Sequence, residues 1–412
     1  MYKSTNQGSN FSPVSTPGSV GDIFESSQSW YDMAMSVSDI NEDEVYVGVL
    51  NVWKTSNSGQ TFVKLNNWNA PFSDAYTHAD IHFLRFYNGE LYAGTDGGFY
   101  KSSDTGINFT DLTAGMQISQ FYKIAVSKQT STKMVGGLQD NGGHAFSNNQ
   151  WQNYYGADGM DTAIDPNNSD AYYGFTQFGG SLNVSSTAGA NLSSQIGGPS
   201  NEQGNWITPL AMSRNSELFA GYSSLYKLTG SGWTAVSQDF GTNVDRIEID
   251  EIDPNIIYIA TNSTLRKSTE NGANFSPVEV FNGNITSIEV NNTDNSIVYV
   301  TTSNSVYKST DGGLNFSNIS NGLPGVTKNC IKHQGLHSLN PLYLATSLGV
   351  YRYDDATLTW ELFNNNLPNV TVTDLEINVF DNMITASTYG RGIWQSAIST
   401  LQATNDIKLV EV

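Results

Sequence analysis

The pattern of apolar and polar positions along this chain is that of short β-strands, and no helical period appears over any length. In residues 245–252, DRIEIDEI, apolar and polar side chains alternate as in a strand with one buried face. The run IIYIAT at 256–261 is apolar throughout, which is typical of a strand buried on both faces. LRKST and FSPVEV follow after turn residues, so this stretch predicts four consecutive strands, and residues 285–320 repeat the same order.

A short turn motif recurs between the third and fourth strands of this unit, most clearly as STDGGLNF at Ser309–Phe316. Its pattern is Ser/Thr-x-Asp/Asn-x-Gly-x-Asn/Thr-aromatic. Short polar side chains can bond their own backbone and glycine allows a positive φ, so each copy predicts a tight turn. We expect its aspartates to bond backbone amides within the turn, a structural role for Ser102, Asp104, Gly106, Phe109, Ser309, Asp311, Gly313 and Phe316. Further copies begin at Ser4, Thr55 and Ser268 (with Glu270 at the acidic position), and weaker ones span Ser185–Leu192 and Tyr353–Trp360.

Four antiparallel strands in a repeat of about 40 to 50 residues predict the blade of a β-propeller. We name the strands of a blade A to D, with A innermost. The sequence predicts nine A strands and an additional C–D hairpin at residues 1–13, so residues 1–398 form an all-β propeller of nine to ten blade repeats. These make either one large ring or parts of two smaller rings. The chain begins part-way through a blade, and residues 399–412 are predicted to be a linker toward a further domain. The predicted A strands start near Tyr31, Asp80, Phe121, Asp161, Ile207, Val244, Ile285, Thr327 and Val372.

The charge balance excludes several classes of partner. The formal net charge is −20, with 19 Lys and Arg residues and no basic cluster, so neither nucleic acid nor an anionic membrane is an expected partner. No apolar run reaches the roughly 18 residues of a membrane span. The single cysteine, Cys330, excludes an internal disulfide and a cysteine-based zinc site, and we interpret it as a packed strand residue. We expect no cofactor and no bound metal.

Strand order sorts the connections onto two faces. The C–D turns, which carry the repeated motif, share one face with the A–B turns, while the D–A and B–C connections share the other. The second face has long, irregular loops with Trp, Gly and polar residues, and binding sites on rigid scaffolds usually lie in such loops. The candidate catalytic residues there are Asp80, Asp96, Asp140 and Asp158. The candidate ligand-binding residues are Trp68, Trp206, His78, His82, Gln139, Asn141, Tyr389 and Arg391.

A purely structural role for each of these residues stays open as an alternative. Trp68 and Trp206 lie outside the strands and either stack on a sugar or pack within their loops. Each aspartate either belongs to a catalytic pair or caps a turn. On one strand His78 and His82 would lie roughly 13 Å apart, which excludes a shared metal unless HADIH is a loop.

With these motifs assembled, the chain resembles the BNR/Asp-box propellers, and among them the sortilin-like, YVTN/BNR-type proteins of secreted bacterial origin. The resemblance rests on HADIH, GTDGGFYKSSDTGINF, QFYKIAVS, GGLQDNGG, GADGMDTAIDPNN and TYGRGIWQSAI, over residues 78–168 and 380–398, and on the repeated turns elsewhere. Sialidases of this superfamily need an arginine triad and an Arg-Ile-Pro-like motif that is absent here. Xyloglucanase-like glycoside hydrolases use two aspartates, and sortilin-type members bind peptides or proteins in a ten-bladed ring.

The sequence therefore predicts an exported bacterial binding or adhesion module, extracellular or on the cell surface and monomeric. Its ligand is a glycan or an extracellular protein, held on the D–A/B–C face. The alternative is a xyloglucanase-like, inverting glycoside hydrolase with two catalytic aspartates. A purely structural spacer is a third possibility. The resemblance also implies type IX secretion for such a protein.

Overall fold

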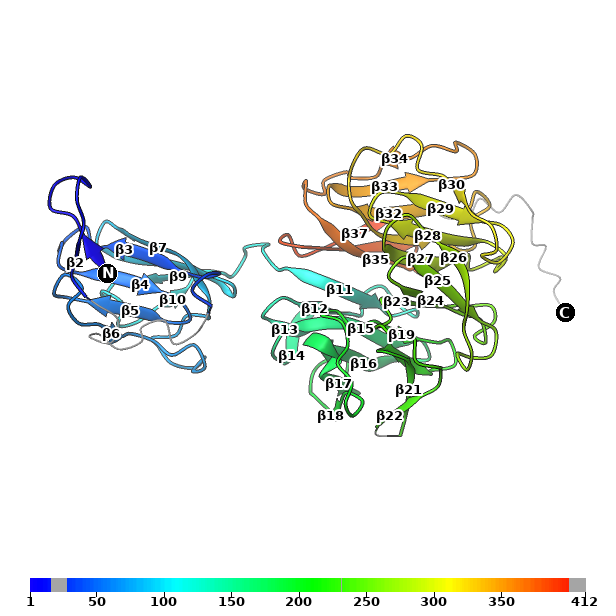
Figure 1. The fold of residues 1–412 in the computed structure, drawn as a ribbon, viewed down its shortest axis with the longest axis horizontal. Helices are drawn as coiled ribbons and strands as arrows, with labels where there is room; N and C mark the ends of the chain where they lie inside the picture. The colour runs from blue at the N-terminus through cyan, green and yellow to red at the C-terminus, as the bar shows by residue number, and fades with distance from the viewer. Residues whose placement is uncertain (16–27, 231, 400–412) are drawn as a thin grey trace. The chain divides into compact units, whose positions relative to one another are not determined.

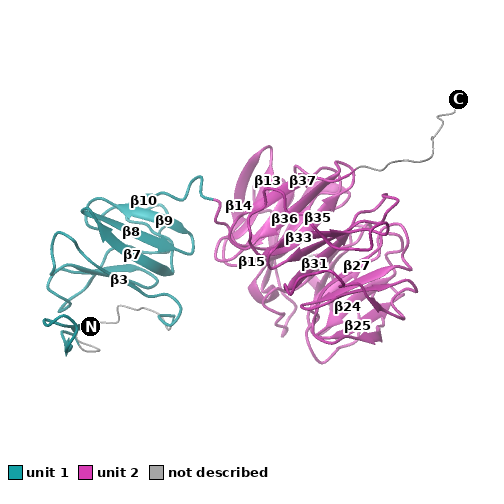
Figure 2. Ribbon diagram, turned by 90° about the horizontal axis from the view of Figure 1, so that it is seen from above, with its two compact units in different colours: residues 1–116 teal, residues 117–412 magenta. Residues whose placement is uncertain are grey.

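A computed structural model of the chain describes residues 1–15, 28–230 and 232–399 (Figure 1). The described residues contain antiparallel strands and one turn of 3-10 helix, η1 (Gln177–Gly179), and no α-helix. They also hold no helix of the length and apolarity that crossing a bilayer requires. The chain folds as two compact units, residues 1–116 and residues 117–412, which Figure 2 shows in teal and magenta.

The first unit contains two four-stranded sheets and a separate hairpin. The hairpin pairs β1 with β2, and the sheets run β3-β4-β5-β6 and β7-β8-β9-β10 in chain order. The strands are β1 (Tyr2–Lys3), β2 (Ser12–Pro13), β3 (Ala34–Val37), β4 (Val45–Gly48), β5 (Val52–Thr55), β6 (Val63–Lys64), β7 (Ile81–Tyr87), β8 (Glu90–Thr95), β9 (Gly98–Ser102) and β10 (Thr110–Asp111).

The second unit contains seven sheets, blades 1 to 7 in chain order. Blades 1 to 6 have four strands and blade 7 has three. Blades 1 to 3 hold β11 (Phe121–Val126), β12 (Met134–Leu138), β13 (Gly142–Ser147), β14 (Gln150–Tyr155), β15 (Gly159–Asp165), β16 (Asn168–Thr176), β17 (Ser181–Ser185), β18 (Ser194–Gly197), β19 (Leu210–Met212), β20 (Leu218–Gly221), β21 (Leu225–Thr229) and β22 (Gly232–Ala235). Blades 4 to 7 hold β23 (Arg246–Ile249), β24 (Ile257–Thr261), β25 (Thr264–Ser268), β26 (Ser276–Val280), β27 (Ile285–Val290), β28 (Val298–Thr302), β29 (Val306–Ser309), β30 (Ser317–Asn318), β31 (Lys328–His333), β32 (Leu342–Thr346), β33 (Gly349–Tyr353), β34 (Glu361–Leu362), β35 (Val372–Asn378), β36 (Met383–Thr388) and β37 (Ile393–Ala397).

The seven blades of the second unit close into a ring around their A strands. Each A strand contacts the next, and β35 of blade 7 contacts β11 of blade 1 (Figure 1). The predicted all-β propeller is therefore confirmed, with nine inner strands beginning close to the predicted positions. Seven of its blades form a ring of their own, so a single ring of nine or ten blades is not what the chain forms. Of the predicted linker 399–412, only Ser399 lies within the described residues.

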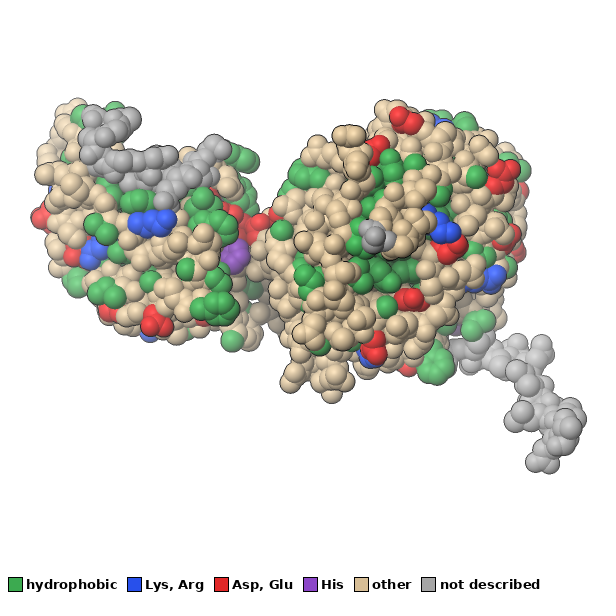
Figure 3. Space-filling model, turned by 90° about the horizontal axis from the view of Figure 1, so that it is seen from below, with side chains coloured by type: hydrophobic (Ala, Val, Ile, Leu, Met, Phe, Trp, Pro, Cys, Tyr) green, Lys and Arg blue, Asp and Glu red, His purple; other side chains and the backbone are tan. Residues whose placement is uncertain are grey.

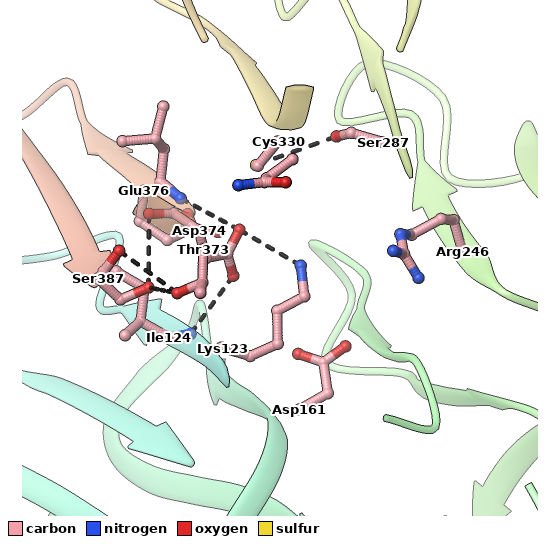
Figure 4. A network of polar contacts seen from close by, with 12 residues as sticks. Lys123, Ile124, Asp161, Arg246, Ser287, Cys330, Thr373, Asp374, Glu376 and Ser387 are labelled. Atoms are coloured by element: carbon pink, nitrogen blue, oxygen red, sulfur yellow. Dashed lines mark hydrogen bonds and ion pairs between the residues drawn. The ribbon is translucent and has the colours of Figure 1, made fainter. Parts of the chain in front are cut away.

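Side-chain-to-backbone bonds join the A strands of neighbouring blades. At the closing seam the Ile124 amide donates to Asp374 Oδ2 at 3.3 Å, and Lys123 Nζ lies 3.4 Å from Asp374 Oδ1 (Figure 4). The hydroxyl of Thr373 donates to the Phe121 carbonyl at 2.9 Å. Inside the ring the same kind of bond joins the Leu210 amide to Asp161 Oδ2 at 3.0 Å and the Ile331 amide to Ser287 Oγ at 3.2 Å.

The repeated turns form closed hydrogen-bonded loops. In the copy at 309–316, Ser309 Oγ accepts from the Gly313 amide at 2.9 Å, and Asp311 Oδ1 accepts from the Leu314 and Asn315 amides at 3.1 and 2.9 Å. The turn also bonds the A–B turn of its own blade, since the Gly312 amide donates to the Ser296 carbonyl at 2.7 Å. The copy at 102–109 repeats the internal bonds. These turns and the A–B turns therefore share one face, as the strand order predicts.

The core lies between blades, where apolar strand residues of adjacent sheets interleave. Tyrosines in the B strands connect this core to the repeated turns. The buried Tyr258 of β24 donates its hydroxyl to the Gly312 carbonyl of the next blade's turn at 2.8 Å. In the first unit Tyr46 of β4 bonds the Thr105 carbonyl, the same turn position, at 3.2 Å.

Candidate functional site

Candidate residues of the second unit converge at the end of its A strands on the D–A/B–C face. Gln139, Asp140 and Asn141 form the B–C connection between β12 and β13, and Asp158 directly precedes β15. Tyr122 lies in β11, where the pairing with β12 is interrupted between Phe121 and Lys123. A β-bulge of this kind re-aims a side chain at the rim of a sheet. The sequence places these residues in two adjacent blades, and the fold brings their side chains together.

A hydrogen-bonded chain runs through this cluster. Asp158 Oδ1 accepts from Gln139 Nε2 at 3.0 Å and from the Asp140 amide at 2.8 Å. The other end of the Gln139 amide, Oε1, accepts from the Tyr122 hydroxyl and, at 3.4 Å, from the Tyr389 hydroxyl. These bonds fix the orientation of the Gln139 amide, because its nitrogen faces a carboxylate and its oxygen faces two phenols.

Aromatic rings flank the polar chain. The Tyr122 ring centroid lies 5.6 Å from that of Tyr389 and 6.4 Å from that of Trp206. Trp206 in turn meets Phe178 edge-on at 5.1 Å, and the Phe178 amide donates to the Trp206 carbonyl at 3.2 Å. Trp206 is 39% exposed and Tyr389 37%, so both present ring surface to solvent beside Gln139 and Asp158. Burial raises the pKa of Tyr122, which therefore keeps its phenolic proton as a donor.

The first unit has a second cluster on its own D–A/B–C face. His82 Nε2 lies 2.8 Å from Asp96 Oδ1, and the Tyr31 hydroxyl donates to Asp96 Oδ2 at 3.1 Å. The rings of Tyr31 and His82 meet edge-on at 4.8 Å. His82 stands at the bulge of β7, between Ile81 and Phe83, which is the position of Tyr122 in β11. The inner-strand bulge thus supplies a site residue in both units.

Two further carboxyl groups adjoin this cluster. Burial raises the pKa of Asp32, while a hydrogen bond with Asp80 and the charge of His82 act in the opposite direction. The nearby charge of Asp96 raises it further. A carboxyl that is desolvated beside like charges keeps its proton more readily than its neighbours. Asp80 has a φ of 61°, a left-handed conformation uncommon outside glycine, so its backbone holds the side chain in an unusual direction.

The remaining predicted residues have contacts of other kinds. The Trp68 amide donates to Asn51 Oδ1 at 2.8 Å, and its ring is 45% exposed. His78 precedes β7 and packs against Gly97, where a Cβ atom would clash with the imidazole ring. Asn141 Nδ2 bonds the Gln139 carbonyl at 2.8 Å, which supports the B–C turn. Arg391 bonds the adjacent Gly390 carbonyl through Nη1 at 2.8 Å.

Sequence reasoning missed Tyr31, Asp32, Tyr122 and Phe178. Tyr31 and Asp32 belong to the segment that leads into β3, and Tyr122 stands inside the motif QFYKIAVS. The available signal was their position in the repeat, because each lies at the start of an inner strand on the irregular face. Phe178 carried no such signal, since its φ of 60° and its place in η1 follow from tertiary packing.

Lysine and arginine side chains do not form a basic patch on the face shown in Figure 3, where they appear singly and several lie beside acidic side chains. This agrees with the absence of a basic cluster in the sequence. The cavity enclosed by the A strands of the second unit, of about 540 Å³, is lined by charged groups of both signs. There Lys332 Nζ lies 3.2 Å from Glu376 Oε1 and 3.8 Å from Glu289 Oε2.

Comparison with known proteins identifies the architecture. No family model matches the chain, and no curated protein sequence matches it. Among solved structures, the GH74 enzyme of Niastella koreensis is similar, with a TM-score of 0.62 and 16% identity over 96% of this chain and 62% of that one. An ancestral GH74 enzyme has a TM-score of 0.56 and 15% identity over 69% of this chain and 45% of its own.

The fold is a β-propeller. At these identities the likeness extends to the architecture alone, and the chain spans less than two thirds of the length of either enzyme. The propeller scaffold hosts many functions, so the site must be interpreted from its own chemistry.

Proposed function

We propose that the chain is a propeller that binds a glycan on the D–A/B–C face of its second unit. The observation that carries the proposal is the oriented Gln139–Asp158 pair flanked by the exposed rings of Trp206 and Tyr389. Sugars combine apolar C–H faces with many hydroxyls. A ring surface beside a fixed amide and carboxylate matches both features, as in small-ligand sites where a few placed polar groups give orientation.

The charge of the protein limits the class of glycan that can bind. The formal net charge is −20, and the cluster contains the carboxyl groups of Asp158 and Asp140. A sulfated or uronic-acid glycan would meet repulsion, whereas a neutral polysaccharide would not. The ligand class we propose is therefore a neutral glycan. Asp158 accepts hydrogen bonds from its hydroxyls, and the Gln139 amide donates to them.

Binding to a panel of neutral oligosaccharides, measured by isothermal titration calorimetry, tests this proposal. Trp206→Ala should weaken binding at least tenfold, and Gln139→Ala should weaken it as well. Trp151→Ala is the matched control, because Trp151 of β14 is similarly exposed, at 43%, and its ring packs against Phe121 and Phe146. Equal affinity in wild type and Trp206→Ala would refute the placement of the site.

A second function, hydrolysis of a polysaccharide, is supported by the carboxyl cluster of the first unit. Glycoside hydrolysis needs one carboxyl that holds a proton and one that is ionised. Asp32, with its raised pKa, beside Asp96, paired with His82, offers two carboxyls in different environments. The likeness to two GH74 enzymes favours considering this chemistry.

Release of reducing sugar from a polysaccharide panel separates the two functions. If the chain is an enzyme, Asp96→Asn and Asp32→Asn should each abolish release without changing the melting temperature. Asp80→Asn and Asp158→Asn test the other candidate carboxyls in the same assay. No release from any polysaccharide by the wild-type chain, together with saturable binding, supports a binding module.

The finer family and cellular assignments belong to this proposal too. We propose a sortilin-like member of the BNR/Asp-box propellers, exported by a bacterium and acting as a monomer outside the cell or on its surface. The closed turns at 102–109 and 309–316 support the family assignment. Fractionation of the native host, with the protein found in the cytoplasm, would contradict the export.

A further inference from the structure

The outermost strand of a blade carries a signature of its own. It reads aromatic-x-x-aliphatic or aromatic, followed in six of eight copies by Asn, Ser or Thr. The aromatic residue is the last position of the repeated turn where that turn is present. The eight copies are Phe11–Val14, Phe62–Leu65, Phe109–Leu112, Trp151–Tyr154, Trp233–Val236, Phe275–Val278, Phe316–Ile319 and Trp360–Phe363.

The last two positions of the signature clamp the C strand. In blade 5 the Ile319 amide donates to the Val306 carbonyl at 2.9 Å, and the Val306 amide donates back to Ser320 Oγ at 2.7 Å. Blade 3 repeats both bonds with Val236, Leu225 and Ser237. The first unit repeats them twice, with Leu65, Val52 and Asn66 and with Leu112, Phe99 and Thr113. The signature is thus the chemical rule by which a D strand binds the edge of a C strand.

The aromatic position fills the space between two blades. Phe316 of blade 5 meets Phe281 of blade 4 at a centroid distance of 5.1 Å and joins a core cluster that includes Ile288 and Val298. Phe275 and Trp360 are 5% and 6% exposed at the corresponding places. A D strand therefore attaches by backbone bonds on its C strand and by an aromatic side chain in the gap behind it.

Blade 7 has no such strand among the described residues. Its sheet ends at β37, whose Ile393 occupies the place of Val306. The Ile398 amide continues the pairing with β36 by donating to the Asn382 carbonyl at 3.0 Å. The chain then moves toward blade 6, because the Ser399 carbonyl accepts from Gln334 Nε2 at 2.7 Å and Ser399 Oγ lies 3.3 Å from His337 Nε2. Residues 398 and 399 thus do not turn back along the edge of β37.

A cavity lies where the missing aromatic side chain would insert. It has a volume of about 270 Å³ and is lined by β33, β34, β35, β36 and β37, between blades 6 and 7. Leu375, Ile384 and Trp394 line this cavity in blade 7. In blade 5 the same strand positions are held by Ile288, Val298 and Tyr307, which belong to the core cluster around Phe316. A gap of this size next to an open strand edge matches the aromatic group of the signature.

We propose that the edge of β37 and this cavity form a docking site for an extended segment of a partner polypeptide. The segment reads aromatic-x-x-aliphatic-Asn/Ser/Thr and adds to blade 7 as its fourth strand. The interface repeats one that is found six times in the second unit, where D strands occupy the same edge of their C strands. Strand addition of this type takes its affinity from main-chain bonds and its specificity from the pocketed side chain.

A labelled peptide tests the site directly. The peptide of residues 314–321, LNFSNISN, is titrated with the full chain and followed by fluorescence anisotropy. We expect saturable binding, and at least tenfold weaker binding of the same peptide with Phe316→Ser and Ile319→Ser. In the protein, Ala386→Phe fills the cavity and should weaken binding at least tenfold. Ala190→Phe, at an exposed position of blade 2, is the matched control and should bind as wild type.

The other outcomes overturn the proposal. Equal binding of both peptides, or undiminished binding by Ala386→Phe with an unchanged melting temperature, would exclude the cavity as the site. Binding that appears only after deletion of residues 400–412 would assign the edge to the chain's own following segment. A concentration-dependent dimer that Ala386→Phe abolishes would assign it to a second copy of the chain.

Discussion

Two buried tyrosines of B strands allow the value of one hydrogen bond to be tested. In Tyr258→Phe the hydroxyl bond to the Gly312 carbonyl is lost, but that carbonyl still accepts from Lys267 Nζ at 3.0 Å. No buried acceptor is stranded, so the cost is that of one net hydrogen bond, about 1 kcal/mol. A second B-strand tyrosine, Tyr172 of β16 in blade 2, packs against the preceding blade, and Tyr172→Phe has the opposite expectation. The Tyr172 hydroxyl is buried and has no hydrogen-bond partner among the described residues.

Removing a buried, unpartnered hydroxyl relieves a desolvation cost without breaking a bond, so Tyr172→Phe should stabilise the protein by about 1 kcal/mol. Tyr172 pairs with Ser185, the first residue of the turn in its own blade, whereas Tyr258 pairs with Lys267, one residue before that turn, so the two side chains face opposite sides of their sheets. The two substitutions delete the same atom and differ in whether the adjacent blade offers the hydroxyl an acceptor.

Urea denaturation followed by tryptophan fluorescence measures the difference. The midpoint should fall for Tyr258→Phe and rise for Tyr172→Phe, at an unchanged slope. The corresponding melting temperatures should move by about 2 to 3 °C in opposite directions. A loss of stability of equal size in both variants would refute this expectation, because it would mean that the hydroxyl acts through packing and not through hydrogen bonding.

Three further predictions concern buried groups of the second unit. Burial lowers the pKa of His333 to about 4, and the Asn292 amide donates to its Nδ1, so the imidazole is neutral in the folded protein. The contribution of His333 to stability is therefore complete above the ordinary histidine pKa of about 6.5 and falls by up to about 3 kcal/mol as the pH drops to 4. Melting temperatures measured against pH should show this fall in the wild type and a smaller one in His333→Gln. Burial raises the pKa of Cys330 to about 12, so the native thiol should resist Ellman's reagent and react only in step with unfolding; rapid labelling of the native protein would contradict this. Asp374→Ala leaves the partly buried Lys123 without its partner at the closing seam and should cost about 3 kcal/mol by urea denaturation, whereas Ser287→Ala at an internal seam, which removes an uncharged acceptor, should cost about 1 kcal/mol.

The sequence predicts the blades well because each blade repeats its own local rules. The alternation in residues 245–252 and the turn at Ser309–Phe316 depend on neighbouring residues only, and both appear in the structure as expected. Ring size does not follow from such rules. It depends on whether the first and last inner strands meet, and the Ile124–Asp374 bond joins residues 250 positions apart.

The candidate site likewise contains residues that local sequence features predict and residues that they do not. The irregular loops of Gln139 and Asp158 make them candidates, and the structure places the two side chains in contact. Tyr122 is not predicted from the sequence, because a tyrosine in a strand usually belongs to the core. Its place in the site follows from the β-bulge in the pairing of β11 with β12. Trp68 shares the composition of Trp206 but meets different surroundings, and composition alone cannot separate the two.

The seam between blade 7 and blade 1 carries a consequence for how this ring could be rearranged. It uses the same amide-to-side-chain bond as the internal seams at Asp161 and Ser287, and none of the described strands belongs to both blades. A circular permutant of the second unit, opened in the loop between β26 and β27 and joined at the old ends, would therefore exchange one seam for another of the same construction. In such a permutant the chain would start at a different blade, while each blade would keep the same neighbours around the ring.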